Sequence, residues 1–341
     1  MRKTLENRLE GLCRKFGYAP YKMSQFEEYE LYVRNKDFLQ SDRVITFSGP
    51  DGRLLAMKPD VTLSIVKNAP EAPGAIAKVH YRENVYRQEG DAGSFREILQ
   101  AGIECVGDVG AYEVAEVLYL AAKTLASLGE GTILSLSHVG LIRWAMDRSG
   151  LPQHTRKQAL DCLGQKREQE LRALCAEHGA DESLLLTLLR ARTIAELESL
   201  EGCEDLAELR QIVALLDPEQ VRLDFSLGND MKYYSGLVFK GYARGVPTSV
   251  LSGGQYDRLL SHMGKKARAI GFAVYLDRLP VEDEEQADAD TLLIFGDAAP
   301  GAVLAAVEAM EGSVLAAKSQ PAEGRWKRRA VLENGEVRYL D

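Results

Sequence analysis

Two extended runs between residues 77 and 107 constrain the fold of this chain more than any other feature of its sequence. They read AKVHYRENVYRQ and SFREILQAGIECVG, and the segment EGDAG that joins them is made of turn-forming residues. Two strand-like runs separated by a short turn are typical of a hairpin. The sequence therefore predicts a long antiparallel hairpin.

The segments around this hairpin predict a mixture of strands and helices. An opening helix is followed, up to Asp60, by short extended segments that the turn-rich SGPDGR interrupts. Residues 112–128 have the period of an amphipathic helix, and residues from about 152 to 216 are helical in almost every window, which predicts an all-helical insertion. We expect strands again at VRLDFSL, GLVFKGY and TSVLSGG, then one helix from Tyr256 and another beginning near Phe272.

A change in composition marks the end of this main domain. The acidic run VEDEEQADAD predicts a linker over residues 283–290. Beyond it, TLLIF, SVLAA, KRRAVLE and VRYL read as strands accompanied by one helix. We therefore expect a main domain over residues 1–282 and a small α/β domain over residues 291–341.

Charge, cysteine usage and hydropathy exclude several classes of protein. The chain has 42 Lys and Arg against 51 Asp and Glu, a net charge of -9, which argues against a surface that grips nucleic acid. Its five cysteines form no CxxC pair, so neither a zinc site nor a disulfide framework is indicated. No apolar window is long enough to cross a membrane, and GxGxxG and P-loop patterns are absent. We expect a soluble, cytoplasmic protein without metal, cofactor, nucleic-acid partner or membrane partner.

The second strand of the hairpin carries the first candidate site. Side-chain alternation places Arg96, Ile98, Gln100, Gly102 and Glu104 on one face. Gln100 and Glu104 flank a glycine that would leave room for a ligand, and a carboxylate beside an amide oxygen suits an ammonium group. A solvated sheet face explains the same pattern equally well.

Polar residues on other segments are further candidates. Asp60 and Thr62 in MKPDVT lie on one side of the chain if that segment is extended. Arg87, on the first hairpin strand, would meet a carboxylate or a phosphate, although a surface salt bridge is the commoner role.

Three tyrosines near glycines suggest a pocket for a small ring. Tyr233 and Tyr234 precede Gly236, and Tyr256 follows the pair of glycines in LSGGQY. Aromatic rings with a polar tip suit a ligand that both stacks and hydrogen-bonds. Ordinary buried tyrosines of a sheet would look the same.

Five motifs taken in order resemble the catalytic domain of histidyl-tRNA synthetases, which are class II aminoacyl-tRNA synthetases. They are MKPDVT, YRQEG with FREILQAGIECVG, YYSGLVF, GGQYDRL and GFAVYLDRL, and the resemblance extends from the start to about Leu279. It implies an α+β fold in which helices flank an antiparallel sheet, with a helical insertion, and it implies a homodimer. The family's histidine-binding residues correspond to six positions of this sequence: Asp60, Thr62, Gln100, Glu104, Tyr234 and Tyr256. We expect Tyr233, which adjoins Tyr234, to bind histidine with them.

The departures from the synthetase pattern fall on the nucleotide side. Asn229 stands where the resemblance implies an arginine that stabilises the phosphate during amino-acid activation, and Tyr275 stands where a glycine lets adenine pack closely. Loss of one such donor typically costs about 3–4 kcal/mol at the transition state. Arg87 and Arg278 remain from the second and third motifs. The resemblance thus implies a vestigial nucleotide site, and the chain beyond it is shorter than an anticodon-binding domain.

This combination resembles the ATP phosphoribosyltransferase regulatory subunits, a family of synthetase paralogues. The resemblance implies a subunit without catalytic residues that assembles, as a homodimer within a hetero-oligomer, with the short-form catalytic subunit HisG. It implies that the chain is required for the first step of histidine biosynthesis and for inhibition of that step by histidine, its effector. The alternative is an active histidyl-tRNA synthetase with a truncated anticodon-binding domain. Asn229 and Tyr275 favour the regulatory subunit.

Overall fold

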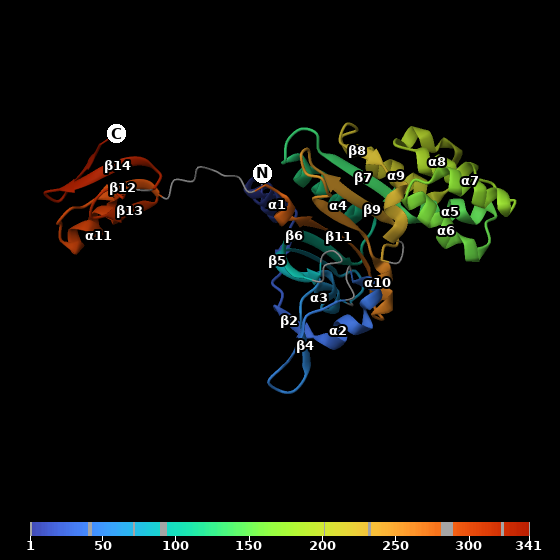
Figure 1. The fold of residues 1–341 in the computed structure, drawn as a ribbon, viewed down its shortest axis with the longest axis horizontal. Helices are drawn as coiled ribbons and strands as arrows, with labels where there is room; N and C mark the ends of the chain where they lie inside the picture. The colour runs from blue at the N-terminus through green and yellow to red at the C-terminus, as the bar shows by residue number, and fades with distance from the viewer. Residues whose placement is uncertain are drawn as a thin grey trace. The chain divides into compact units, whose positions relative to one another are not determined.

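The chain forms two units, each with its own core (Figure 1). The larger is Met1–Pro280 and the smaller is Val281–Asp341. The computed structural model describes residues 2–39, 43–70, 72–88, 94–200, 202–230, 233–280, 289–321 and 324–340, and of residues 199 and 228–230 it describes the backbone alone.

An eight-stranded sheet lies at the centre of the larger unit, with the order β1-β5-β6-β11-β10-β9-β7-β8. Its strands are β1 (Ala19–Pro20), β5 (Ile76–Gln88), β6 (Phe95–Gly107), β11 (Arg268–Tyr275), β10 (Leu251–Gln255), β9 (Leu237–Tyr242), β7 (Ile133–His138) and β8 (Val221–Leu223). The outer pairs β1–β5 and β7–β8 are parallel, and all pairs between them are antiparallel.

The predicted hairpin is confirmed as the longest ladder of this sheet. β5 and β6 pair without interruption from Ile76 opposite Gly107 to Gln88 opposite Phe95. The EGDAG segment, residues 89–93, lies outside the described residues.

One face of the sheet is covered by α1 (Arg2–Lys15) and α4 (Ala111–Ala126) (Figure 1). Leucines of α1 and aliphatic residues of α4 form one apolar core with Ile103 and Cys105 of β6. The odd-numbered residues in this part of β6 therefore point away from the predicted site, as strand alternation requires.

The opposite face carries a second apolar core and the candidate site. It is covered by α2 (Tyr29–Arg34), η1 (Lys36–Phe38), α3 (Thr62–Lys67), α10 (Asp257–His262) and a small sheet in the order β2-β4-β3, formed by β2 (Phe26–Glu28), β4 (Leu54–Met57) and β3 (Thr46–Ser48). Tyr81, Tyr256 and Tyr275 are buried in this core beside Leu63 and Leu259.

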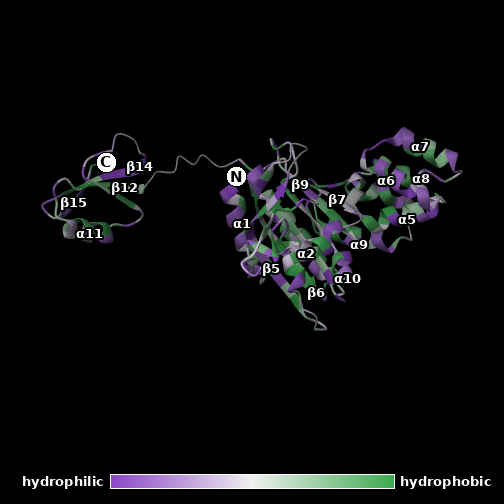
Figure 2. Cartoon of the chain, turned by 60° about the horizontal axis from the view of Figure 1, so that its bottom comes forward, coloured by the Kyte–Doolittle hydropathy of each residue, from purple (hydrophilic) through white to green (hydrophobic). Residues whose placement is uncertain are grey.

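Between β7 and β8 the chain is helical, as predicted. The elements are α5 (Val139–Ser149), η2 (Gln153–Thr155), α6 (Arg156–Gly164), α7 (Glu168–Glu177), α8 (Ser183–Arg190), η3 (Ile194–Leu200) and α9 (Glu204–Val213). Hydrophobic and hydrophilic stretches alternate along these helices (Figure 2), which is typical of helices with one buried side. Their leucines extend the core that lies under α4.

The smaller unit is a four-stranded sheet with one helix. The strand order is β13-β12-β14-β15, and the elements are β12 (Ala289–Ile294), α11 (Pro300–Ala309), β13 (Val314–Ala317), β14 (Trp326–Glu333) and β15 (Glu336–Tyr339). Leu293, Ala306, Ala330 and Leu332 form its buried core. Of the run proposed as a linker, residues 281–288 lie outside the described residues, and Ala289 begins β12.

Two predicted elements are wrong. The helix expected near Phe272 is part of strand β11, which buries almost every residue because both faces of the sheet are covered. A run that is apolar on both sides does not distinguish a buried strand from a helix. The strand expected over VRLDFSL ends at Leu223, and η4 (Phe225–Asp230) follows because the Asp224 carboxylate accepts hydrogen bonds from the backbone and side chain of Ser226.

Over the described ranges of the chain, no helix is both long enough and apolar enough to cross a bilayer.

The close approach of β5, β6 and β11 makes Gly102 intolerant of a side chain. A Cβ at this position would lie 2.4 Å from the Phe272 carbonyl oxygen and 2.6 Å from Oη of Tyr81. We expect Gly102→Ala to lower the free energy of unfolding by about 1–3 kcal/mol, as overpacking does in other cores. Urea denaturation measures this. Gly11→Ala in α1, where nothing lies within 4 Å, is the control, and it should leave stability unchanged or raise it. Equal effects of the two substitutions would contradict the packing described.

Candidate functional site

A cavity of about 470 Å³ lies on the face covered by α2, α3 and α10. All seven residues predicted to bind histidine line it: Asp60, Thr62, Gln100, Glu104, Tyr233, Tyr234 and Tyr256. Arg87, Tyr275 and Arg278 of the predicted nucleotide site line it as well. The side chain of Asn229 lies outside what the structure describes.

Glu104 is the centre of the cavity wall. Its side chain is buried, Tyr256 Oη donates to Oε2 at 2.6 Å, and Thr62 Oγ1 donates to Oε1 at 2.9 Å. Burial raises the pKa of Glu104 from 4.5 to about 8, although the two hydrogen bonds oppose that shift. Among the described residues, no lysine or arginine forms an ion pair with Glu104, so a cationic group of a ligand would supply the missing counter-charge.

A second buried carboxylate lies nearby. Asp60 Oδ1 accepts a hydrogen bond of 3.0 Å from the Leu63 N–H, and Arg87 Nη2 lies 3.5 Å from Asp60 Oδ2. Burial raises the pKa of Asp60, and the charge of Arg87 opposes this. The expectation that Asp60 and Thr62 share one side of an extended segment is wrong, because Thr62 begins α3. Both residues still reach the cavity because the chain turns between them.

Gln100 presents an unpaired hydrogen-bond donor. Its side chain is 2% exposed, and its Nε2 has no hydrogen-bond partner within the described part of the chain. A buried amide donor without an acceptor is uncommon in folded proteins. The cavity wall therefore offers a donor at Gln100 on the same face of β6 as the carboxylate of Glu104.

Aromatic rings form the next part of the wall. Tyr233 lies edge-on to Tyr234, with ring centroids 4.8 Å apart, and its ring lies 5.9 Å from Tyr256. The space that a side chain at the adjacent Gly254 would need is already filled by a protein side chain. A Cβ at Gly254 would lie 2.6 Å from the ring of Tyr234.

Tyr81 is a cavity residue that the sequence reasoning missed. It lies opposite Gly102 in the β5–β6 ladder, and its hydroxyl lies where a side chain at Gly102 would project. The expectation that Gly102 leaves room for a ligand is therefore wrong, because that room holds a phenol. The hairpin register contained the signal, since a large residue paired with a glycine tends to fill its place.

The arginines of the predicted nucleotide site bind to the protein itself. The guanidinium of Arg278 lies 4.0 Å from the centre of the Tyr275 ring, and Nη1 donates to the Ser249 carbonyl oxygen at 2.7 Å. Nε of Arg87 donates to the Pro59 carbonyl oxygen at 2.5 Å. Stacking and hydrogen bonding of this kind hold a guanidinium in place.

Comparison with known proteins identifies the family. Residues 1–279 match the family described as Histidyl-tRNA synthetase. An ATP phosphoribosyltransferase regulatory subunit of Moorella thermoacetica is 30% identical over 362 residues, covering 98% of this chain and 88% of that protein. A Histidine--tRNA ligase of Methanoregula boonei is 28% identical over 294 residues, covering 82% of this chain and 70% of the ligase. The chain belongs to the family of histidyl-tRNA synthetases and ATP phosphoribosyltransferase regulatory subunits.

Solved structures of this family share the fold. A Bacillus halodurans C protein described as an ATP phosphoribosyltransferase regulatory subunit/histidyl-tRNA synthetase has a TM-score of 0.76 at 25% identity, covering 92% of this chain and 88% of that chain. A chain of the ATP phosphoribosyl transferase (HisG:HisZ) complex from Thermotoga maritima has a TM-score of 0.65 at 19% identity, covering 80% and 96%. The class II synthetase-like α+β fold predicted from the sequence is confirmed.

The raised pKa of Glu104 makes stability depend on pH. Between pH 4.5 and about 8 the folded chain keeps this proton and the unfolded chain releases it, so the free energy of unfolding should fall as pH rises through that window. We expect Glu104→Gln to remove this part of the dependence, which amounts to at most about 1.4 kcal/mol per pH unit. Urea titrations at several pH values test it. The exposed Glu130→Gln is the control and should leave the slope unchanged. If the free energy of unfolding of Glu104→Gln falls with pH as steeply as that of the wild type, Glu104 is not the group responsible.

Proposed function

We propose that this chain is a non-catalytic regulatory subunit of ATP phosphoribosyltransferase, and that its cavity binds histidine as the feedback inhibitor. One contrast within the cavity carries this proposal. The carboxylate of Glu104 is buried without a cation, whereas the guanidinium of Arg278 is held by Tyr275 and Ser249. The first arrangement favours an amino acid, and the second disfavours a nucleotide.

The chemistry of the wall matches histidine group by group. Its ammonium would pair with Glu104, since a buried ammonium without a counter-charge costs several kcal/mol. The unpaired Nε2 of Gln100 would donate to a ligand acceptor. The rings of Tyr233 and Tyr234 supply an aromatic surface for the imidazole.

The nucleotide side supports a role without amino-acid activation. Tyr275 is buried and carries Arg278 on its ring, so an adenine would have to displace both. Asn229 replaces the arginine that the synthetase resemblance implies at that position. Adenylate formation would then lack the arginine that Asn229 replaces, and the guanidinium of Arg278 would already contact Tyr275.

The partner is inferred from the relatives and from an exposed surface. Relatives named as regulatory subunits and the solved HisG:HisZ complex support a complex with the short-form catalytic subunit HisG. The homodimer proposed within that complex rests on the resemblance to the synthetases alone. The small sheet exposes Phe26, Phe47 and Leu54, with the two phenylalanine rings edge-on at 5.6 Å. An apolar patch of this kind supports a subunit contact.

The five cysteines are free and buried, which fits the cytoplasm.

Histidine titration of the reconstituted complex tests this function. The chain should raise phosphoribosyl transfer to ATP by its catalytic partner, and histidine should inhibit the mixture. Glu104→Gln deletes the charge and keeps the shape, so the inhibition midpoint should rise roughly 10- to 150-fold, which corresponds to about 1.5–3 kcal/mol. Activation should persist, because the substitution lies inside the cavity. Glu130→Gln, on the surface, should behave as wild type.

Two outcomes would refute parts of this proposal. If the partner alone turns over as fast as the mixture, the activating role is wrong. If Glu104→Gln activates normally and shows an unchanged inhibition midpoint, histidine acts at a different site.

Histidine-dependent ATP–pyrophosphate exchange tests the alternative of an active synthetase. We expect no exchange above background for the wild-type chain. Asn229→Arg alone should not restore it, because Tyr275 and Arg278 still occupy the nucleotide side. Exchange well above background in the wild type would establish amino-acid activation and sink the non-catalytic assignment.

A further inference from the structure

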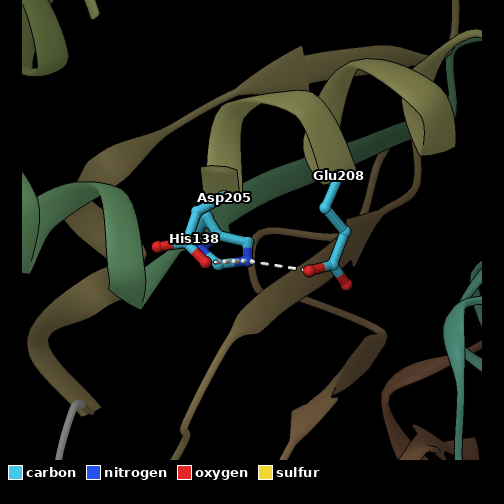
Figure 3. A group of neighbouring side chains, drawn as sticks. All are labelled: His138, Asp205 and Glu208. Carbon is cyan, nitrogen blue, oxygen red and sulfur yellow. Dashed lines mark ion pairs between the residues drawn. The ribbon is translucent and has the colours of Figure 1, made fainter. Parts of the chain in front are cut away.

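A histidine and two carboxylates meet where the helical insertion packs against the central sheet (Figure 3). His138 is the last residue of β7, and Asp205 and Glu208 lie three residues apart on α9, so they share one side of that helix. His138 Nε2 is 3.9 Å from Asp205 Oδ1 and 4.0 Å from Glu208 Oε2. One potential ligand atom from each residue lies within 4.8 Å of the other two. None of the three lines the histidine cavity.

The imidazole nitrogen that faces the carboxylates has no partner. His138 is 2% exposed, and its Nε2 makes no hydrogen bond to any described residue. Figure 3 shows this nitrogen directed between Asp205 and Glu208. Its distances to them are too long for hydrogen bonds. A buried polar nitrogen left in this way needs a partner, which a water molecule or an ion would supply.

The backbone is shaped to admit the carboxylate of Asp205. A Cβ at Gly140 would lie 2.1 Å from Asp205 Oδ2, so any larger residue at this position would push the side chain away. Both carboxylates are partly exposed, at 40% for Asp205 and 32% for Glu208. The cluster is therefore buried on the histidine side and open to water on the carboxylate side.

We propose that His138 Nε2, Asp205 and Glu208 bind one divalent transition-metal ion, best fitted by Zn²⁺, with water as the remaining ligand. Imidazole nitrogen and carboxylate oxygen are both zinc ligands, and an imidazole favours zinc over Ca²⁺ or Mg²⁺. Zinc bonds of about 2.0–2.2 Å would bring the ligand atoms to roughly 3.4 Å from one another. Rotation of the partly exposed carboxylates supplies the small inward movement that this requires.

Coordination changes the hydrogen bonding of His138. Its Nδ1 now accepts a hydrogen bond of 3.2 Å from the Gly140 N–H, which caps α5 and leaves the neutral ring's proton on Nε2. Ligation uses the Nε2 lone pair, so this proton moves to Nδ1 and the Gly140 N–H loses its acceptor. A zinc–imidazole bond outweighs one cap hydrogen bond.

Other charged groups also act on the cluster. Arg143 acts electrostatically on His138, and Arg268 and Asp257 act on Glu208. Arg268 also pairs with Asp257, at 3.3 Å between Nε and Oδ2. A bound ion would join α9 of the insertion to β7 of the central sheet, and so would fix the insertion in place.

Zinc titration of the untagged full-length chain tests this site. After treatment with a chelator and dialysis, calorimetry should show one equivalent of Zn²⁺ bound, and Zn²⁺ should raise the unfolding temperature. Asp205→Asn and Glu208→Gln should each weaken binding at least tenfold. Glu204→Gln removes the same charge from an exposed position of the same helix and should bind as wild type. Co²⁺ in place of Zn²⁺ should give visible absorption of a four-coordinate site in the wild type and in Glu204→Gln.

Circular dichroism establishes that each variant is folded before its affinity is compared. Absence of stoichiometric Zn²⁺ binding to the wild type would overturn the proposal. Equal affinity in the wild type, Asp205→Asn and Glu208→Gln would also overturn it, because the ion would then bind elsewhere on the chain.

Discussion

The antiparallel ladder between β5 and β6 is the constraint on which the larger unit depends. Neighbouring strands join both of its sides, β1 along β5 and β11 along β6. Because alternate residues face opposite ways, one set buries Ile103 and Cys105 under α1 and α4, and the other directs Gln100 and Glu104 into the cavity. A shift of one residue in this register would exchange the two sets and abolish core and site together.

Glu104 would link the stability of the chain to binding of the proposed histidine ligand. Burial without a cationic partner raises its pKa to about 8. A ligand ammonium would favour the charged form and stabilise the folded state in proportion to its binding. Glu104 would thus lower the free energy of unfolding of the ligand-free protein as pH rises, and raise that of the ligand-bound protein.

Local patterns in the sequence predicted much of this molecule. The hairpin, the helical insertion and the strands at GLVFKGY and TSVLSGG follow from periodicity and turn residues, and the structure has them. Periodicity failed at β11, because a strand covered on both faces carries no polar side to mark it. It also failed at Gly102, where a neighbouring strand decides what fills the space that the glycine leaves.

The sequence by itself determined which residues share one side of a strand or one side of a helix. Gln100 and Glu104 share one side of β6 because of strand alternation, and Asp205 and Glu208 share one side of α9 because of helical spacing. Only the tertiary structure decided which distant groups meet them. It placed Tyr256 and Thr62 on Glu104, laid Arg278 on Tyr275, and directed His138 at the two acids of α9. Local spacing is set by backbone geometry over a few residues, whereas these contacts arise from packing between segments far apart in the chain, which no short-range pattern encodes.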